Sequence, residues 1–375
     1  MNRKRSIVFS LVRGLAAILI ALAVATLLIF ISSEGESLAE KLAATGDALR
    51  QLLIGPLFRS SGGLNTKNLS VILAAMIPTI FTGLGVCVMF SANEFNCGGE
   101  GCVMVGAFVA SLCAIYIPMP GFLHPLFCVL VAMLVCGAIM LIPALLKVKL
   151  GASEMVCTLM LNYVLLYIVK HFLTNVFADR SRGQTQTLRF LDTAQIPSIV
   201  VRAKLTWGFF IAIACAALIW LFMYRTRWGY TIRMLGVNKL FSGYSGLKVG
   251  GTVVLAQVVG GMLSGMGGSI EMLGRYTSFK WNSLPGYGWD GMTVAILAKN
   301  NPAFVPLAAF FIAYLDRGCQ LMATYCDISS NMIDIIQAVI FLFFAAEQFL
   351  AGYRQKLVVK GAREELLAAE GGARA

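Results

Sequence analysis

Charged residues are scarce in this chain. Asp, Glu, Lys and Arg make up 13% of its 375 residues, whereas a soluble domain carries about 25%. Hydrophobic residues make up 58%, and the mean hydropathy is +0.80. Several charge-free runs reach the roughly 20 residues that a helix needs to cross a bilayer. Short segments of alternating polarity, which would indicate a membrane β-barrel, are missing. The sequence therefore predicts an all-α, polytopic transmembrane helix bundle.

Enzyme signatures are also missing. The chain has no G-x-x-x-x-G-K-[ST] phosphate loop, so we expect no nucleotide hydrolysis of that kind, and it has no H-E-x-x-H motif. Its two histidines, His124 and His171, flank predicted spans and fit interface residues better than catalytic ones. We therefore predict no enzymatic activity and no catalytic residue.

The ten cysteines include no C-x-x-C pair, and most of them lie inside apolar runs. This placement fits small packing residues better than metal ligands or a disulfide framework. We predict no metal site and no cofactor bound by the chain. The formal net charge is +12, but the basic residues are spread over loops between spans. That distribution is typical of membrane anchoring and argues against a nucleic-acid partner.

The apolar runs predict about ten spans in a transmembrane domain at 1–352, followed by a basic and polar tail at 353–375. The predicted spans are 7–31, 69–90, 102–117, 123–146, 153–176, 206–224, 251–273, 286–299, 303–325 and 331–351. Basic clusters near 147–149, in 225–250 and in the tail place these segments and both termini in the cytoplasm by the positive-inside rule. The basic outer loop 177–205 runs against this trend.

One predicted span is short. It contains only 13 residues from Tyr287 to Lys299 inclusive, and Asp290 is one of them. Such a helix rises about 20 Å, less than the bilayer core. An earlier start near Leu284 or a broken helix would account for it, and both alternatives stay open here.

The segment 34–66 is expected to lie outside the membrane. It carries charges every few residues and leucines at helical spacing. These leucines are Leu38, Leu42, Leu49, Leu52 and Leu53. The pattern predicts an external amphipathic helix against the membrane or the bundle.

Ionisable residues occur inside or beside the apolar runs, where burial costs at least a few kcal/mol unless a cavity or partner receives the charge. They include Glu94, Glu100, Glu154, Glu271 and Asp290. For Glu154, Ser153 as helix N-cap with a carboxylate in the first turn is a sufficient structural account. Glu271 lies near the end of a span, and a carboxylate that simply reaches water is one interpretation of it.

Small residues recur at every fourth position in two spans. One series is Gly261, Gly265 and Ser269, and the other is Cys102, Gly106, Ala110 and Ala114. Such stripes let helix backbones approach closely. We interpret both as packing surfaces and not as ligand sites.

The loop 225–250 contains a predicted amphipathic helix from Tyr230 to Tyr244, bounded by Gly229 and Gly246. Arg233 and Lys239 are expected to face solvent. Ile232, Leu235 and Leu240 are expected on the opposite side. An ordinary surface loop and a docking helix for a cytoplasmic partner are the two interpretations.

Four stretches resemble motifs of one transporter family. In the loop, Gly229, Arg233, Gly236, Asn238, Tyr244 and Gly246 fit a G-x-x-x-R-x-x-G-x-N pattern followed by a residue pair ending in Gly. The other stretches are FNCGGEGCVMVGAF, GASEMVCTLMLNYV and PGYGWDGMTVAILAKNNP. Together they resemble the ATP-binding cassette (ABC) importer permeases of the ribose/nucleoside branch. Cys102 stands where that family usually has Gln, and Ala298-Lys299 where a Gly is common.

The resemblance implies a permease subunit in the bacterial inner membrane, paired with a second permease as a homo- or heterodimer. A cytoplasmic ABC ATPase would hydrolyse ATP and dock on the loop. An external binding lipoprotein would deliver a nucleoside or related sugar. The glycine-rich segment 91–101, which the alternation of spans places on the cytoplasmic side, fits a plain inside turn on charge alone. Set beside the family pattern it would form a bend in the transport path, because broken backbone at membrane depth must face protein or a water-filled cavity. Our candidate pathway residues are Asn96, Glu100, Asn162, Trp289 and Asp290.

An ion-coupled secondary transporter of a small polar solute remains the alternative. In that interpretation Glu94, Glu100 and Asp290 are carboxylates that bind protons or sodium.

Overall fold

The computed structural model describes residues 38–58, 63–179, 183 and 185–326, with isolated residues at 23, 24, 26, 27, 29, 30, 335, 338 and 339. These residues form two compact units, and Leu57–Arg317 make up the larger one. The predicted spans at 7–31 and 331–351 lie almost wholly outside the described residues, and the tail at 353–375 lies entirely outside them.

The larger unit is built from helices. In chain order these are α3 (Thr66–Ser91), α4 (Gly99–Tyr116), α5 (Leu123–Leu150), α6 (Glu154–Asn175), α7 (Gly208–Arg225), α8 (Arg227–Val237), α9 (Lys239–Tyr244), α10 (Val249–Arg275), α11 (Tyr287–Leu297) and most of α12 (Val305–Tyr325). Between α6 and α7 lie two 3₁₀ turns, η1 (Asp192–Ala194) and η2 (Val201–Ala203), and an antiparallel hairpin of β1 (Ser198–Val200) and β2 (Leu205–Thr206).

Six described helices are long and apolar enough to cross a membrane: α3, α4, α5, α6, α7 and α10. They coincide with six of the predicted spans. Helix α12 also forms where a span was predicted, but it falls outside this group of six and carries Asp316 and Arg317. The total of ten spans and the side on which each terminus lies stay predictions.

Helix α11 settles one open alternative. It has 11 residues, so it rises only about 16 Å and cannot cross a bilayer core alone. It does not start earlier near Leu284, because Gly286 precedes it with a φ of +89°. A turn that includes Lys299 and Asn300, both with positive φ, separates it from α12. The predicted span at 286–299 is therefore corrected to a short helix.

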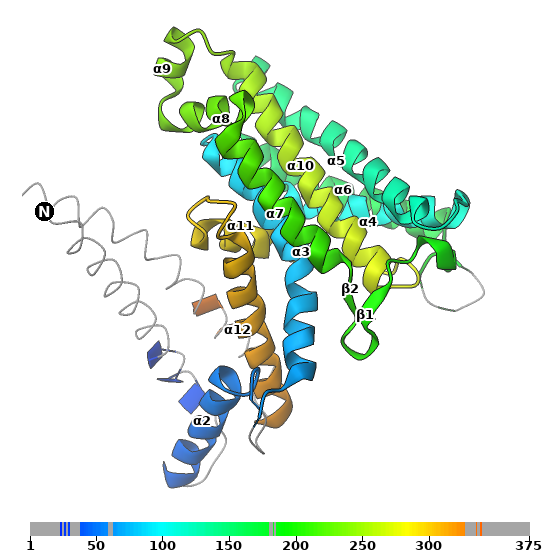
Figure 1. Ribbon diagram of the computed structural model, residues 1–375, viewed down its shortest axis with the longest axis vertical. Coiled ribbons are helices and arrows are strands. Elements are labelled where there is room, and N and C mark those ends of the chain that lie inside the picture. Colours follow the sequence, from blue (N-terminus) through cyan, green and yellow to red (C-terminus); the bar gives the residue numbers. More distant parts are fainter. Residues whose placement is uncertain are drawn as a thin grey trace, which may run out of the picture. The chain divides into compact units, whose positions relative to one another are not determined.

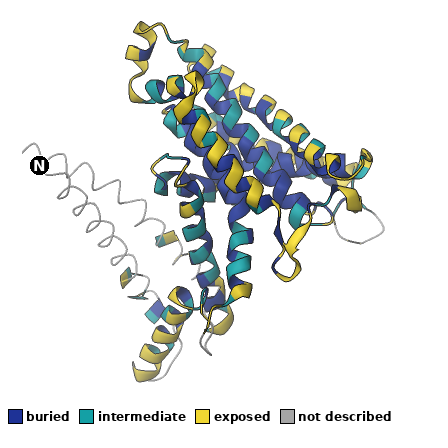
Figure 2. Ribbon diagram, viewed as in Figure 1, coloured by how far each residue is buried: buried dark blue, intermediate teal, exposed yellow. Residues whose placement is uncertain are grey.

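Helix α10 occupies the centre of the bundle and packs against α3, α4 and α5 (Figure 1). Burial follows this arrangement: α3, α4 and α10 are largely buried, whereas α5, α6 and α7 each expose a side (Figure 2). The small-residue stripes, and Gly268 beside one of them, make the close contacts. A Cβ placed on Gly106 of α4 would lie 2.4 Å from the Gly265 carbonyl oxygen of α10, and one on Gly268 would lie 2.1 Å from the Val103 carbonyl oxygen. The predicted packing role of both stripes is confirmed.

In the other unit, α2 (Leu38–Leu53) forms within the predicted amphipathic segment 34–66. Its leucines do not share one buried face. Leu52 is fully buried, whereas Leu42 is 58% exposed and Leu53 is 41% exposed. The helix is thus confirmed, but the predicted arrangement of its apolar side chains is only partly correct.

The contact between α4 and α10 predicts unequal effects for two substitutions in α10. Gly268→Ala should lower stability by about 1–3 kcal/mol, because the new methyl group overlaps backbone that cannot move aside. Gly251→Ala is the control, since its Cβ would lie 3.8 Å from the nearest atom, Lys248 Cβ. Alanine favours helix at both positions. Thermal unfolding midpoints in detergent measure the difference, and equal midpoints would contradict the packing account.

Candidate functional site

The backbone breaks between α3 and α4. Helix α3 ends at Ser91, Asn93 adopts a φ of +58°, and α4 begins at Gly99. Residues 92–98, here called the break segment, contain no regular helix. Backbone polar groups that are buried away from water must find partners inside the protein. The neighbouring helix α6 supplies them.

Three side chains of α6 hold the break segment. Glu154, Thr158 and Asn162 are spaced by four residues and therefore lie on one face of the helix. Glu154 Oε1 accepts from the Phe95 N–H (3.4 Å), and Thr158 Oγ1 accepts from the Cys97 N–H (3.1 Å). Asn162 donates to the Cys97 carbonyl (2.9 Å). The α6 ladder, as we call these three residues, replaces the missing helical hydrogen bonds.

Asn162 continues the ladder into α4. Its Oδ1 accepts from the Gly101 N–H at 2.9 Å, which satisfies one of the unpaired donors in the first turn of that helix. Asn96 plays a similar part inside the break segment. Its Oδ1 accepts from the Gly98 N–H (2.7 Å), and its Nδ2 donates to Gln257 of α10 (3.2 Å). Both asparagines are buried.

Glu100 fixes the start of α11. Its two carboxylate oxygens accept from the Gly286 N–H and the Gly288 N–H, each at 2.5 Å. A carboxylate at this position also complements the positive end of the α11 dipole. Close packing enforces the arrangement, because a Cβ on Gly288 would lie 2.4 Å from the Glu100 nitrogen. Glu100 therefore ties α4 to α11 across 186 residues of sequence.

Trp289 and Asp290 lie in the first turn of α11, directly after the residues that Glu100 binds. The Trp289 side chain is 43% exposed, and Asp290 is half-buried. The Asp290 carboxyl lies within electrostatic range of Glu100 and Asp316. The structure thus brings Glu100, Trp289 and Asp290 together, with Asn96 and Asn162 in an adjoining cluster around the break segment. Their predicted place on a substrate pathway stays a prediction.

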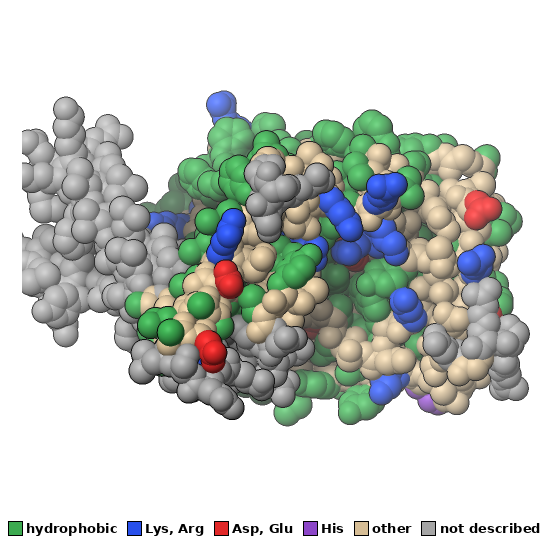
Figure 3. All heavy atoms as spheres, turned by 90° about the horizontal axis from the view of Figure 1, so that it is seen from below, with side chains coloured by type: hydrophobic (Ala, Val, Ile, Leu, Met, Phe, Trp, Pro, Cys, Tyr) green, Lys and Arg blue, Asp and Glu red, His purple; other side chains and the backbone are tan. Residues whose placement is uncertain are grey.

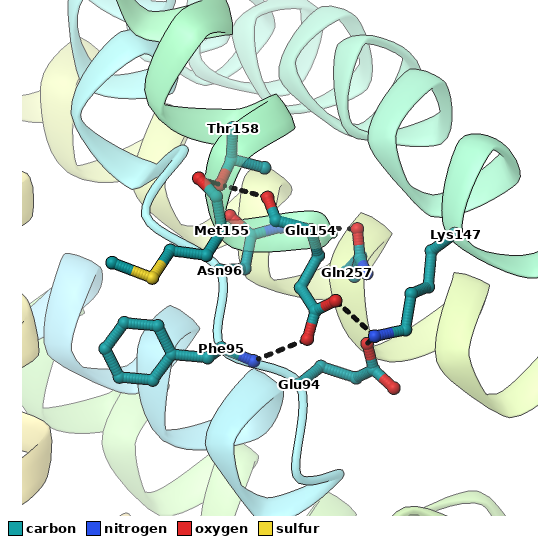
Figure 4. A network of polar contacts seen from close by, with 8 residues as sticks. All are labelled: Glu94, Phe95, Asn96, Lys147, Glu154, Met155, Thr158 and Gln257. Atoms are coloured by element: carbon teal, nitrogen blue, oxygen red, sulfur yellow. Dashed lines mark hydrogen bonds and ion pairs between the residues drawn. The ribbon is translucent and has the colours of Figure 1, made fainter. Parts of the chain in front are cut away.

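A group of charged residues lies where α5 ends and α6 begins, beside the break segment (Figure 4). Lys147 contacts Glu154, and its Nζ lies 3.8 Å from Glu94 Oε2. Burial raises the pKa of the Glu94 carboxyl, and the charge of Lys147 opposes that shift. Ser153 occupies the N-cap position and Glu154 lies in the first turn of α6, as predicted, but the Ser153 side chain makes no capping hydrogen bond. The N-cap account is incomplete, because Glu154 also pairs with Lys147 and accepts from the Phe95 N–H.

Glu271 is not a carboxylate that simply reaches water, because it is 1% exposed. Its Oε1 accepts from Arg275 (2.8 Å) and from the Tyr287 hydroxyl (3.2 Å). Because Tyr287 is the first residue of α11, this pair attaches α10 to the same helix end that Glu100 holds.

The predicted loop helix at 230–244 is two helices, α8 and α9, which meet at Asn238. The Asn238 N–H closes α8 by donating to the Met234 carbonyl (3.2 Å), and its Oδ1 caps α9 by accepting from the Phe241 N–H (3.0 Å). Asparagine is common at this cap position, because its side chain can accept a hydrogen bond from the backbone N–H groups at the start of a helix. Gly246 follows with a φ of +78°.

Helix α8 is seated on the bundle. Ile232 and Leu235 are buried as predicted. Arg233 does not simply face solvent: its Nε donates to the Met223 carbonyl (3.1 Å), and its guanidinium lies 4.7 Å from the Tyr224 ring centroid. A Cβ on Gly236 would lie 2.1 Å from the Ser91 carbonyl oxygen. The backbone of α8 therefore touches the last residue of α3, immediately before the break segment.

Helix α9 projects from the bundle at the end opposite the β1–β2 hairpin (Figure 1). Leu240 is 75% exposed and Tyr244 is 90% exposed, so the expectation that Leu240 packs inward is wrong. Phe241 is exposed beside them. Exposed apolar and aromatic side chains on one short helix form a surface that suits a protein partner.

Comparison with known proteins identifies the family. A family model described as the permease component of branched-chain amino acid transport systems matches residues 68–345. The chain belongs to this family. The match covers α3 to α12 and includes the break segment, the α6 ladder and the α8–α9 loop.

Relatives of this permease are ABC transporter subunits. It is 29% identical to the guanosine ABC transporter permease NupP of Bacillus subtilis, over 76% of this chain and 83% of that protein. It is 30% identical to the nucleoside permease NupB of Lactococcus lactis, over 78% and 83%. It is 28% identical to the glucose permease TsgB13 of Haloferax volcanii, over 76% and 78%. The chain is thus a multi-pass ABC transporter permease, and the secondary-transporter alternative is not supported.

The structure also identifies residues that the sequence left unassigned. Thr158 had no predicted role, and Glu154 had a local one. The available signal was their spacing with Asn162 at i, i+4 and i+8, one helix face opposite a glycine-rich interruption. Gln257 gave no signal, because its partner Asn96 is 161 residues away.

The hold of Glu100 on α11 can be tested by substitution. Glu100→Ala removes both acceptor oxygens and leaves the Gly286 and Gly288 N–H groups without them. Each of these hydrogen bonds to a charged group contributes about 1.5–3 kcal/mol. Glu100→Gln keeps one acceptor oxygen and should lose less stability. Hydrogen exchange at residues 286–291 should rise strongly in the alanine variant and moderately in the glutamine variant. Unchanged exchange in both would show that Glu100 does not hold α11.

Proposed function

We propose that this permease is one of two membrane subunits of an ATP-driven importer in a bacterial inner membrane, and that its substrate is a nucleoside or a related sugar. The observation that carries the proposal is the direct contact between α8 and the end of α3 next to the break segment. Two of the three relatives named above are nucleoside permeases and one is a glucose permease, which supports the substrate class.

A cytoplasmic ABC ATPase is the proposed partner at α8 and α9. The exposed residues of α9 give it an apolar surface to bind, and the loop residues Gly229 to Gly246 match the family's docking pattern. In this proposal the permease binds no nucleotide, metal or other cofactor, and ATP is hydrolysed by the partner. A second permease and an external substrate-binding lipoprotein complete the transporter.

The hydrogen bonds described above suggest how movement of the docking loop reaches the pathway. A shift of α8 would press on Ser91, because backbone meets backbone there and no flexible side chain lies between. The break segment would move against the α6 ladder, which holds Cys97 from both sides. That motion would carry Glu100 and therefore the start of α11. Such a change is a shift between two arrangements that ATP and substrate bind unequally.

Within this scheme the five candidate pathway residues divide into two roles. Asn96, Glu100 and Asn162 are buried and bonded to backbone, so they position the bend and the start of α11. Trp289 and Asp290 are the more accessible pair. An indole face can stack on a nucleobase, and a carboxylate can accept hydrogen bonds from ribose hydroxyl groups. We therefore assign substrate contact to Trp289 and Asp290.

Uptake of labelled substrates tests the proposed function. Cells that express the complete transporter should accumulate labelled guanosine, and other nucleosides should compete better than ribose or glucose. An ATPase subunit with an inactive nucleotide site should abolish uptake, whereas collapse of the proton gradient with ATP maintained should leave it intact. Uptake that follows the gradient and ignores the ATPase would overturn the proposal.

The coupling route predicts a specific uncoupled variant. Gly236→Ala should reduce the rate of substrate uptake at least tenfold, because the added Cβ would overlap the Ser91 carbonyl and displace α8. The matched control is Gly243→Ala in α9, whose Cβ would lie 3.9 Å from the nearest atom. Both variants should insert and keep the ATPase bound, as shown by co-purification. Normal uptake with Gly236→Ala would refute the route through Ser91.

A further inference from the structure

An apolar groove opens at the end of the bundle opposite α8 and α9. Its volume is about 400 Å³, which lies within the range of small-ligand sites in proteins. The first turns of α5 and α7, the last turns of α10, and the Ile196–Pro197 segment surround it, and every lining residue is apolar or aromatic.

The groove has a buried floor and an exposed rim. Val129 and Ile270 are less than a tenth exposed and form part of the floor, whereas Phe122 is 76% exposed and Trp207 is 55% exposed at the edge. A ligand can therefore enter the groove from the surface of this chain.

The depth of the groove follows from the ends of the helices. Phe122 precedes α5, and Val129 lies seven residues further along it, so the groove extends about 10 Å inward. Trp207 stands directly before α7. Tryptophan at the end of a membrane span is typical of the boundary between water and lipid. The groove therefore starts at headgroup level and runs into the hydrocarbon.

Positive charge lies on the hairpin whose base adjoins the groove. Pro197 and Trp207 both line the groove and close the hairpin base through the Trp207 N–H and the Pro197 carbonyl (3.2 Å). The hairpin carries Arg202 and Lys204, both exposed. Lys and Arg side chains gather on the face of the molecule seen in Figure 3, with few acidic ones among them.

The acidic residues near the groove do not cancel this charge. Glu271 follows the floor residue Ile270 but is buried and paired with Arg275. In the described part of the loop between α6 and the hairpin, the acidic residues are Asp179, at the start of the loop, and Asp192 on η1, which is exposed. Arg202 and Lys204 therefore leave the hairpin basic.

We propose that this groove is a binding site for an anionic glycerophospholipid. One acyl chain occupies the groove between α5, α7 and α10, and the phosphate lies beside Arg202 and Lys204. An apolar channel of this depth with cations at headgroup level matches both parts of such a lipid. The assignment to the outer leaflet rests on the proposed function, because it follows from α8 and α9 facing the cytoplasm.

The test is native mass spectrometry of the complete transporter, purified in detergent and titrated with phosphatidylglycerol or phosphatidylcholine. We expect one phosphatidylglycerol to bind at least tenfold more tightly than phosphatidylcholine. Arg202→Ala with Lys204→Ala should remove that preference, whereas Arg189→Ala, in the same loop, should keep it. Equal binding of the two lipids by the unmodified transporter would overturn the proposal.

A second pair of variants tests the acyl-chain part. Leu126→Trp narrows the groove at its rim, whereas Leu134→Trp adds the same bulk to an exposed site on the same helix. Only Leu126→Trp should weaken phosphatidylglycerol binding, with both variants eluting as intact transporter. If Leu126→Trp instead separates the two permeases and leaves lipid binding unchanged, the groove is a subunit interface and the proposal is wrong. Lipid binding is measured without transport, so a failed uptake experiment would remove only the leaflet assignment.

Discussion

The need to satisfy the hydrogen bonds of buried backbone determines how this permease is built. The chain interrupts a helical path at residues 92–98, and each buried polar group left unpaired there would cost about 1–3 kcal/mol. The α6 ladder meets that requirement with side chains in place of a backbone ladder. Because side chains can change partners more easily than a helix can unwind, the same device that stabilises the bend also leaves it able to move.

Two kinds of contact hold the helices around this bend. The contact between α4 and α10 is made through glycines with backbone against backbone, so it cannot slide without overlap. The contact between α4 and α11 combines equally close packing at Gly288 with one carboxylate, Glu100, that bridges two N–H groups. The short helix α11 is therefore fixed at its first turn both by packing and by a charged acceptor.

Much of the fold could be predicted from hydropathy, because an apolar run of about 20 residues has few structural alternatives in a bilayer. The six candidate spans and the glycine stripes needed nothing else. The kink at Asn238 was missed because capping depends on the conformation that a residue adopts, whereas a helical apolar pattern runs straight through it. Among the site residues, Glu100 stood out as an ionisable group in an apolar setting. Its partners at Gly286 and Gly288 were invisible, since backbone donors carry no sequence signature.

The two helices of the docking loop differ in how freely they can vary. Helix α9 presents most of its side chains outward, Ser242 excepted, so these exposed residues can change without disturbing the bundle. Gly236 in α8 meets the Ser91 carbonyl with no room for any side chain. If an ATPase docks on this loop as proposed, recognition of the partner and transmission of its movement are encoded in separate places a few residues apart. A permease built in that way would be able to acquire a different ATPase through changes in α9 while its internal mechanics stay the same.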